Sequence, residues 1–475
     1  MSGWQSDGVE HLTYAARDAA FTARVWKGLQ KDAGDDELIQ TLYSTHLQLA
    51  RIAAEMHTAG IYVNREWLGF MRVCTLQERD EAGAAWQAQV GTDRNPTDSV
   101  MRAVMYARHK VKGVPCFELP DPYDKRMYTD DSLQSISVDA NSMLLLAATT
   151  QLPEAVLRVM ARWATYQKKK KRYSAIRERN DKGELTSLEK AIGPDGRLRA
   201  GWNSCGTDTM RFSCSEPNVQ NIEQILRHYL APAPGRVIVH ADKRQLEIRV
   251  MAVVAADMVL QDAIDSGDVY SAEACDYFHR DPATFDPDHN KKDKGARRSA
   301  KIIRLARQYG AGKQTVFMQA LRQDTSFTFA MAGTLMQAFD KRYYRTVEYW
   351  HEEMARVKQC GYSEGRIIGG RRYYPRPPDL SETVNFPIQR SAAEMMNLEL
   401  IELDKRLKAE VPKANIICQL HDAIDVECAE KDEEKVCKII DEVMHREWTS
   451  CGMTRLFPIE RKVTRASEGG TWYDV

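Results

Sequence analysis

The stretch from Arg236 to Ala252, RVIVHADKRQLEIRVMA, decides the fold expected for this chain. It contains Val237 to Val239, a short run of apolar β-branched residues that is typical of a buried strand. Asp242 stands where such a strand leaves the core, so its carboxylate is expected at the edge of a cleft, where it can hold a cation. Most aspartates at strand ends only cap a helix or a turn, so Asp242 alone does not establish a site.

A second candidate strand lies near the C-terminus, where Ile416 to Leu420 runs into His421-Asp422 before Ala423 to Val426. Two such strands side by side would bring Asp242 and Asp422 together at a tight turn. Carboxylates that close repel each other, and divalent cations are the usual remedy. We therefore expect divalent cations between the two aspartates.

A helix with one functional face is predicted between these strands. Arg297, Lys301, Leu305 and Tyr309 follow at steps of four, with Gly310 directly after. Such steps drift only about 40° each around a helix, so the side chains share one face. The first turns of this face are basic. A helix N-terminus together with Arg297 and Lys301 is suited to grip a triphosphate, while Tyr309 and Gly310 end the helix beside a base.

In order and spacing, the three segments resemble motifs A, B and C of family A DNA polymerases, the group of bacterial DNA polymerase I and many phage replicases. Motif A of the family, Asp-Tyr-Ser-Gln-Ile-Glu-Leu-Arg, is similar to residues 242–249. Motif B has an Arg, a Lys, an aromatic residue and a Tyr-Gly pair, and is matched except at Leu305. Motif C, His-Asp-Glu, is matched at His421-Asp422 but has Ala423 in place of the Glu.

The resemblance implies a mixed α+β fold with the right-hand architecture of polymerases, in which a palm with an antiparallel sheet carries helical fingers and a helical thumb. The implied domains are an exonuclease remnant at 1–35, palm at 36–64 and 191–250, thumb at 65–190, fingers at 251–405 and palm again at 406–475. The remnant rests on Tyr14-x3-Asp18, which resembles the end of a 3′–5′ exonuclease domain. The other acidic motifs of that site would lie upstream, so we expect no proofreading in this chain.

The resemblance also implies nucleotidyl transfer, with Asp242 and Asp422 holding two Mg²⁺ ions and Lys301 as a further catalytic residue. Glu247 matches the residue that crowds the 2′ position of the incoming sugar, which predicts selection of deoxynucleotides. The other residues implied to bind the nucleotide are Arg297, Gln245, Leu305, Tyr309 and Tyr270. Those implied to bind DNA are Arg211, Asn218, Gln220, Asn221, Gln389 and His421.

A basic run, Lys168, Lys169, Lys170, Lys171 and Arg172, lies in a long helical pattern. Such runs are usually solvated helix faces. This one precedes a polar segment that is similar to the family's Thr-x-Thr-Gly-Arg-Leu-Ser and Pro-Asn-Leu-Gln-Asn-Ile motifs. We therefore expect it to contact duplex phosphates, which would make DNA affinity fall with salt.

Three positions depart from the family pattern. Leu305 replaces an aromatic residue that packs on the nucleotide, which predicts weaker binding or altered discrimination at a cost of about 1 kcal/mol of stacking. Tyr270 replaces a phosphate-contacting His. Ala423 removes a carboxylate beside the metal site, and the two aspartates are expected to suffice without it. Asp425, three residues along the strand, is expected to point away.

Composition sets the outer limits. With 475 residues, of which 43% are hydrophobic, the chain is large enough for two or three subdomains. Lys plus Arg equals Asp plus Glu, at 67 each, so any nucleic-acid surface is local. Ten cysteines without a CxxC pair fit reduced thiols. No leader is visible, and no stretch is apolar for the roughly 18 residues of a membrane span. We expect a cytoplasmic enzyme of a bacterium, or of a phage acting in its host, without membrane partners.

The expected partners are primer-template DNA and deoxynucleoside triphosphates, with a separate exonuclease or other replication proteins, and the chain is expected to be a monomer. Two alternatives stay open. One is a single-subunit RNA polymerase of related palm architecture, whose motif C also lacks the Glu; Glu247 argues against it. The other is a noncatalytic nucleic-acid-binding protein, motivated by Ala423, Leu305 and Tyr270. The presence of both aspartates and of the basic helix argues against that.

Overall fold

The computed structural model describes residues 36–122, 127–129, 136–150, 152–321 and 327–474. The exonuclease remnant predicted at 1–35 lies outside these described residues. The mixed α+β fold class is confirmed, because helices of up to 31 residues surround one antiparallel sheet and several short hairpins.

The central sheet has four antiparallel strands in the spatial order β12 (Ile459–Arg465), β5 (Arg236–Lys243), β9 (Ala423–Ala429) and β8 (Asn415–Leu420). The strand predicted at 237–239 is the middle of β5. Since β5 is an inner strand, Asp242 has a neighbour on each side: Glu460 on β12 and Ala423 on β9. Directly paired residues of antiparallel strands project to the same face.

The two faces of the sheet differ in chemistry because side chains alternate along a strand. Val237, Val239 and Ala241 of β5 belong to the large core that α2 (Glu37–Ala59), α15 (Leu380–Glu410) and α16 (Glu433–Met444) complete. The opposite face carries Ile238 in a smaller core with Trp472. His240 and Asp242 follow Ile238 on this second face. The apolar residues of β5 are packed in the two cores, and they hold in place the strand that carries Asp242.

A helical arm extends from the sheet region. It is built on α3 (Arg65–Val90) and α6 (Glu154–Ile176), which pack along each other, with α4 (Asp98–Met105) and α5 (Ala140–Thr149) at its far end. Trp86 and Trp163 are fully buried in its separate core, and their rings lie 5.4 Å apart. The arm therefore has a core of its own.

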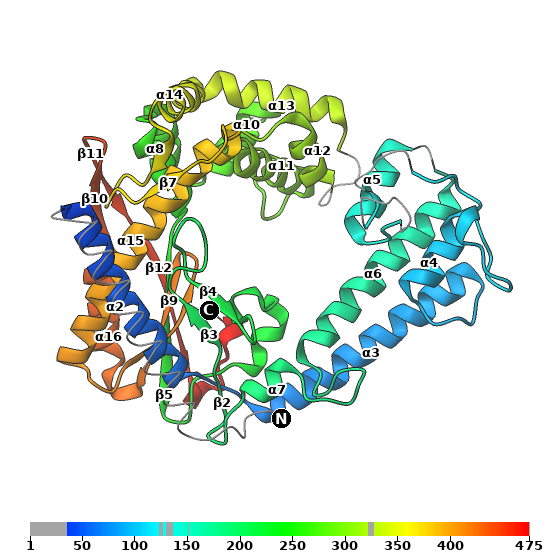
Figure 1. Cartoon of the computed structure of the whole chain (residues 1–475), viewed down its shortest axis with the longest axis horizontal. Helices are drawn as coiled ribbons and strands as arrows, with labels where there is room; N and C mark the ends of the chain where they lie inside the picture. The colour runs from blue at the N-terminus through cyan, green and yellow to red at the C-terminus, as the bar shows by residue number, and fades with distance from the viewer. Residues whose placement is uncertain (1–35, 123–126, 130–135, 151, 322–326, 475) are drawn as a thin grey trace, which may run out of the picture.

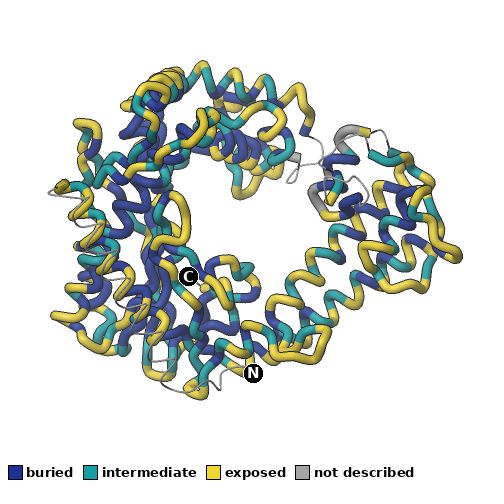
Figure 2. Tube along the Cα trace, viewed as in Figure 1, coloured by how far each residue is buried: buried dark blue, intermediate teal, exposed yellow. Residues whose placement is uncertain are grey.

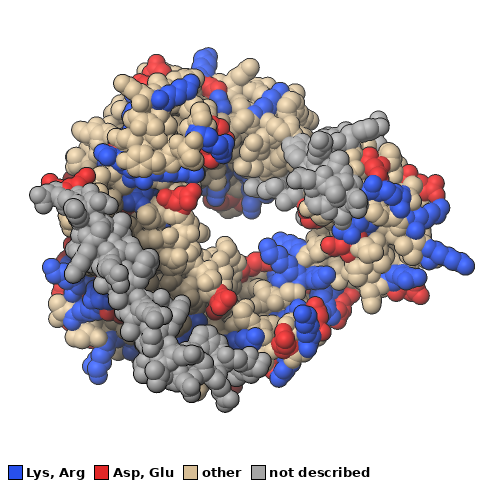
Figure 3. Space-filling view, viewed as in Figure 1, with Lys and Arg blue, Asp and Glu red and all other residues tan. Residues whose placement is uncertain are grey.

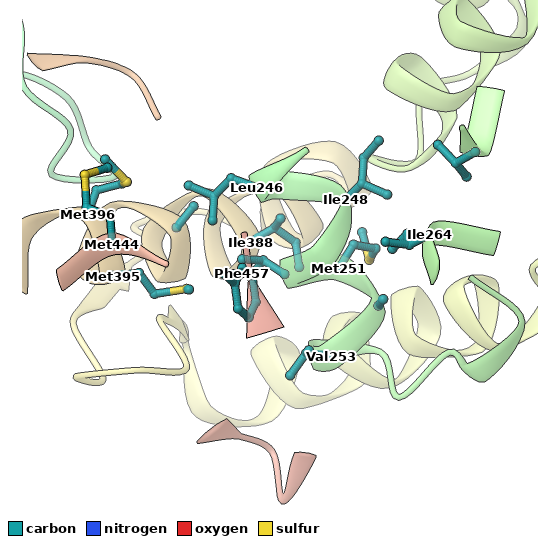
Figure 4. Packing of buried hydrophobic residues seen from close by; sticks show 14 of the residues in the cluster. Leu246, Ile248, Met251, Val253, Ile264, Ile388, Met395, Met396, Met444 and Phe457 are labelled. Atoms are coloured by element: carbon teal, nitrogen blue, oxygen red, sulfur yellow. The ribbon is translucent and has the colours of Figure 1, made fainter. Parts of the chain in front are cut away.

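A second group of helices follows β5 directly. It consists of α8 (Leu246–Val254), α9 (Met258–Asp265), α10 (Val269–Tyr277), α11 (Lys291–Arg307), α12 (Lys313–Leu321), α13 (Phe329–Arg342) and α14 (Tyr344–Cys360). Figure 4 shows Leu246 and Met251 of α8 beside Ile388 of α15 and Phe457, so α8 joins these helices to the sheet core.

The sheet, the arm and the helical group enclose a central opening (Figure 1). Buried residues concentrate in the sheet and the helical group, whereas much of the surface along the opening is exposed (Figure 2). The remaining elements are β1 (Ile61–Tyr62), α7 (Ser187–Ala191), β2 (Arg197–Leu198), β3 (Gly201–Asn203), β4 (Ser213–Ser215), β6 (Tyr362–Glu364), β7 (Arg371–Tyr373), β10 (Arg446–Ser450), β11 (Met453–Phe457) and the 3-10 helices η1 (Ala107–His109), η3 (Val219–Asn221), η4 (Gln224–Tyr229), η5 (Glu430–Asp432), η6 (Ala466–Glu468) and η7 (Trp472–Asp474).

All ten cysteines are free thiols. Within the described ranges, no helix combines the length and the apolar composition that crossing a bilayer requires.

Candidate active site

The structure brings Asp242 and Asp422 together, as expected. Asp242 is the penultimate residue of β5, and Asp422 lies in the turn between β8 and β9. The backbone N–H of Lys243 donates to the backbone carbonyl of Asp422 over 3.0 Å, which fixes the turn against the strand. His421 has a φ of 58°, so the turn passes through the left-handed region and leaves its imidazole exposed.

Both carboxyl groups hold their protons more tightly than usual. Burial, and then the charge of Asp422, raise the pKa of Asp242 to about 6, although His240 acts in the opposite sense. Burial also raises the pKa of Asp422. The Oδ1 atom of Asp242 is buried and, among the described residues, has no hydrogen-bond partner. A buried carboxylate oxygen without a donor, beside a second acid, suits a divalent cation.

Asp425 corrects the expectation that it points away from Asp242. It pairs with His240 in the register, one step deeper on the face that carries Asp242. Asp425 is fully buried, and its two oxygens accept hydrogen bonds from His240 Nδ1 at 2.6 Å and Trp472 Nε1 at 3.2 Å. Burial opposes a charge on His240, but the neighbouring Asp425 carboxylate prevails and raises the imidazole pKa. Asp425 therefore shares the face but has its oxygens occupied.

Glu247 joins three sequence-predicted residues into one cluster. It lies in the first turn of α8, and its two carboxylate oxygens accept hydrogen bonds from Arg211 and from the Tyr309 hydroxyl. Burial and the charge of Glu247 raise the pKa of Tyr309 well above its ordinary value, so the phenol stays protonated and donates. Gln245 precedes α8 with a φ of 54°, and its buried Oε1 has no partner among the described residues.

The α11 face carries the predicted cations, but they have partners. Arg297 donates to Asp268 over 2.6 Å, and both Arg297 and Lys301 lie over the ring of Tyr270, at 5.6 and 5.5 Å from its centre. Burial raises the pKa of the Tyr270 phenol to about 12. Leu305 is 41% exposed on the same face.

One part of the helix prediction is wrong. The N-terminus of α11 lies at Lys291, and the side chain of Asn290 already accepts hydrogen bonds from the N–H groups of Lys292 and Asp293. Arg297 follows six residues later, or about 9 Å along the axis. Two N–H groups at the N-terminus of α11 are therefore already bound by Asn290, which leaves the side chains of Arg297 and Lys301 as the candidates for binding a triphosphate.

The predicted DNA-binding residues divide by exposure. Asn221 and His421 are exposed, and Gln389 is half-buried. Asn218 caps η3 by accepting from the Asn221 N–H. Gln220 is buried, and its amide hydrogens go to the backbone carbonyls of Phe212 and Gln419. Gln220 was predicted to contact DNA, but its amide hydrogens already bind the protein. They join the end of β8 to the segment around Phe212.

The basic run on α6 also divides. Lys168, Lys170 and Lys171 are exposed. Lys169 instead forms an ion pair with Glu78 at 2.7 Å, and Arg172 pairs with Glu78 at 3.2 Å and with Glu223 at 3.0 Å. In Figure 3, Lys and Arg side chains gather at the rim of the opening beside α6. The helix period thus turns part of the run inward against acids and leaves the rest facing solvent.

Sequence reasoning missed three residues of this region: His240, Asp268 and Glu460. His240 carries a usable signal, since it falls two residues before Asp242 on β5 and so on the same face. Glu460 carries none, because its place beside Asp242 depends on the pairing of β12 with β5.

A profile of DNA polymerase family A matches residues 128–472. Among curated relatives, DNA polymerase I of Chloroflexus aurantiacus is 24% identical over 457 residues, which covers 91% of this chain and 44% of that protein. DNA polymerase I of Geobacillus stearothermophilus is 28% identical over 310 residues, covering 61% of this chain and 33% of that protein. The chain therefore spans less than half the length of these relatives.

Solved structures show the same fold. The POL domain of Pol1 from M. smegmatis, in complex with DNA primer-template and dNTP, superimposes with a TM-score of 0.70 at 21% identity, covering 90% of this chain and 70% of that one. The right-hand architecture expected from the sequence is thereby confirmed. With its profile match across most of its length and both aspartates in place at the end of the palm sheet, this chain belongs to DNA polymerase family A.

Proposed function

We propose that the chain is a DNA-directed DNA polymerase that adds deoxynucleotides to a primer 3′ end. The observation that carries this proposal is that Asp242 at the end of β5 lies beside Asp422 in the β8–β9 turn, with an unpartnered buried oxygen on Asp242. Its substrates are a primer-template and deoxynucleoside triphosphates, the ligands named for the similar M. smegmatis structure. It acts in the cytoplasm as a monomer.

We assign to the chain the domain roles expected from the sequence. Residues 36–64, 191–250 and 406–475 are the palm; the arm, at 65–190, is the thumb; and residues 251–405, which include most of the helical group, are the fingers. The continuous helix α15 crosses the limit at 405, so motion of the fingers would be transmitted to the palm through one rigid element.

The residues present fit two Mg²⁺ ions held by Asp242 and Asp422. When bound, such ions activate the primer hydroxyl and neutralise the triphosphate and the leaving pyrophosphate. Arg297 and Lys301 would bind the phosphates by charge-assisted contacts. To do so, Arg297 has to exchange its bond to Asp268 for one to the nucleotide.

Glu247 would select the sugar. Its carboxylate is held between Arg211 and Tyr309, so it is a fixed obstacle rather than a flexible one. A fixed side chain at the 2′ position of the sugar excludes an extra hydroxyl by contact. Arg211, proposed to bind DNA, and Tyr309, proposed to lie beside a base, are thereby connected to the residue that selects the sugar.

Primer extension tests the proposal. Wild type and Asp242→Ala are compared on a primed template with Mg²⁺, with deoxynucleotides and ribonucleotides supplied in separate reactions. We expect extension by deoxynucleotides only, abolished by the substitution. Glu447→Gln is the matched control, because Glu447 is exposed on β10. Extension with ribonucleotides would favour an RNA polymerase. Absence of extension with intact salt-sensitive duplex binding would favour a noncatalytic protein.

A further inference from the structure

The sheet offers Asp242 a third acidic neighbour. The register pairs Asp242 with Ala423 on β9 and with Glu460 on β12. Cβ atoms of directly paired residues lie about 4.5–5.5 Å apart and on one face of the sheet. On the β9 side, the neighbour of Asp242 is therefore the methyl group of Ala423. On the β12 side, its neighbour is the carboxylate of Glu460.

Glu460 is also the acid in this neighbourhood whose oxygens remain available. It is exposed and, among the described residues, forms no hydrogen bond or ion pair. Asp425 is bound by His240 and Trp472, and Glu427 accepts from Arg197 at 2.7 Å and Arg236 at 3.0 Å.

We propose that Glu460 is the third carboxylate of the metal site and takes over, from the opposite side of Asp242, the position left open by Ala423. This inference rests on the proposed polymerase function. Among the described residues, no three His, Cys, Asp or Glu side chains are arranged as a closed metal cluster. Glu460 therefore acts on a bound cation through a water ligand or after a rotation of its flexible, exposed side chain.

The structure also explains why an edge strand can supply this group. β12 is the outer strand of the sheet, paired on one side only, and its residues 460–462 are exposed. A charged residue on an edge strand commonly serves only to prevent pairing with another chain. Glu460 differs from such a residue by its alignment with Asp242, and the experiment has to separate the two roles.

Manganese binding measures the metal site without turnover. The full chain is combined with a primer-template whose primer ends in a dideoxynucleotide, together with the matching deoxynucleotide. Free Mn²⁺ is followed by electron paramagnetic resonance during a titration. We expect Glu460→Gln to weaken Mn²⁺ binding by about tenfold, the scale at which partners of metal ligands act. Glu460→Lys should weaken it further, and the exposed control Glu447→Gln should match wild type.

A second variant tests whether Glu460 acts on the bound cation locally or only through long-range charge. Lys462 is aligned with His240, one step deeper than Glu460, and is equally exposed. If Glu460 acted only through long-range charge, Lys462→Gln would tighten Mn²⁺ binding by about as much as Glu460→Gln weakens it. We expect less than a twofold change for Lys462→Gln. Equal and opposite changes would overturn the proposal.

The failures can be told apart. Identical Mn²⁺ affinities of Glu460→Gln and Glu447→Gln would show that Glu460 is only an edge-strand residue. If wild type itself bound no Mn²⁺ that depends on Asp242, with Asp242→Asn as reference, the polymerase proposal would fail instead. Because Glu460 is exposed and unpaired, Glu460→Gln should keep the melting temperature of wild type, which excludes unfolding as a cause.

Discussion

Charged side chains at the end of the central sheet and on α11 differ in whether they have partners. On the sheet, Asp242 has a buried oxygen without a donor, and Glu460 has no partner among the described residues. On α11, Arg297 is bonded to Asp268, and Arg297 and Lys301 both lie over the Tyr270 ring. The acids are left unpaired, whereas the cations are already engaged.

This difference has a physical reason. Unpaired carboxylates in a partly buried site repel each other and bind a divalent cation more strongly for it. Cations on an exposed helix face can instead be held by a carboxylate and an aromatic ring, contacts that a phosphate exchanges at little cost. The side proposed to hold the metal ions (the metal side) is therefore strained without its ligand, and the side proposed to bind the nucleotide (the nucleotide side) is held by contacts that a phosphate can replace.

After the loss of extension expected for Asp242→Ala, the largest effect is expected from removing a cation of α11. In Lys301→Ala, the triphosphate loses a positive charge that has no carboxylate partner in the described structure. We expect kcat/KM for the deoxynucleotide to fall by about 100- to 1,000-fold, as for other lost groups that stabilise developing charge. Single-nucleotide primer extension measures it. Values within a few-fold of wild type would remove Lys301 from the site.

The next effect concerns stability on the metal side. The pKa of Asp242, raised to about 6, means that the native state binds its proton more tightly than the unfolded chain does. Stability therefore falls as pH rises from the ordinary aspartate range through about 6. Without metal at pH 7, Asp242→Asn should raise the free energy of unfolding by about 1 to 2 kcal/mol, allowing for solvent screening.

Urea unfolding in the presence of a chelator measures this difference between Asp242→Asn and wild type. The gain should disappear below about pH 4, where the native and unfolded carboxyl groups are both protonated. Asp425→Asn is the contrasting variant, because the oxygens of Asp425 are hydrogen-bonded, and we expect it to destabilise. A loss of stability in Asp242→Asn at pH 7 would contradict the unpaired state of this acid.

A smaller effect follows from freeing Arg297. Asp268→Asn removes the negative charge that competes with the triphosphate for the guanidinium. We expect KM for the deoxynucleotide to fall by about threefold with kcat unchanged, because only initial binding improves. Steady-state extension at varied nucleotide concentration decides the matter. A higher KM would mean that Asp268 orients Arg297 for binding instead of competing for it.

The smallest effect distinguishes paired from unpaired lysines on α6. Lys170 is exposed without an ion pair in the described ranges, whereas Lys169 is bound to Glu78. Lys170→Gln should lower the slope of log affinity against log salt by about 0.9, the value for one phosphate contact. Lys169→Gln should change it by much less. Duplex binding by fluorescence anisotropy at several salt concentrations checks both, and equal slopes for the two variants would contradict the division of the run.

Several features of the site could be predicted from local sequence. The apolar run before Asp242 and the steps of four from Arg297 to Leu305 report short-range periodicity, which is found in β5 and α11, whereas Tyr309 lies just beyond the end of α11. The N-cap of α11 at Asn290 was not predicted, because a polar residue in a charged loop does not reveal that its side chain accepts hydrogen bonds from the first helical N–H groups. Gln220 was misassigned because a polar residue in a polar loop does not reveal that its amide binds a distant strand.

The sequence by itself determined the family, the two strands that end in aspartate and the basic helix face, because each is encoded by spacing along a few turns or one strand. Only the tertiary structure decided which charges have partners. Strand order placed Glu460 beside Asp242, and packing joined Asp425 to His240 and Asp268 to Arg297. These contacts join segments between 29 and 218 residues apart, and no periodicity extends over such separations, so long-range pairing rather than local pattern set the electrostatics of the site.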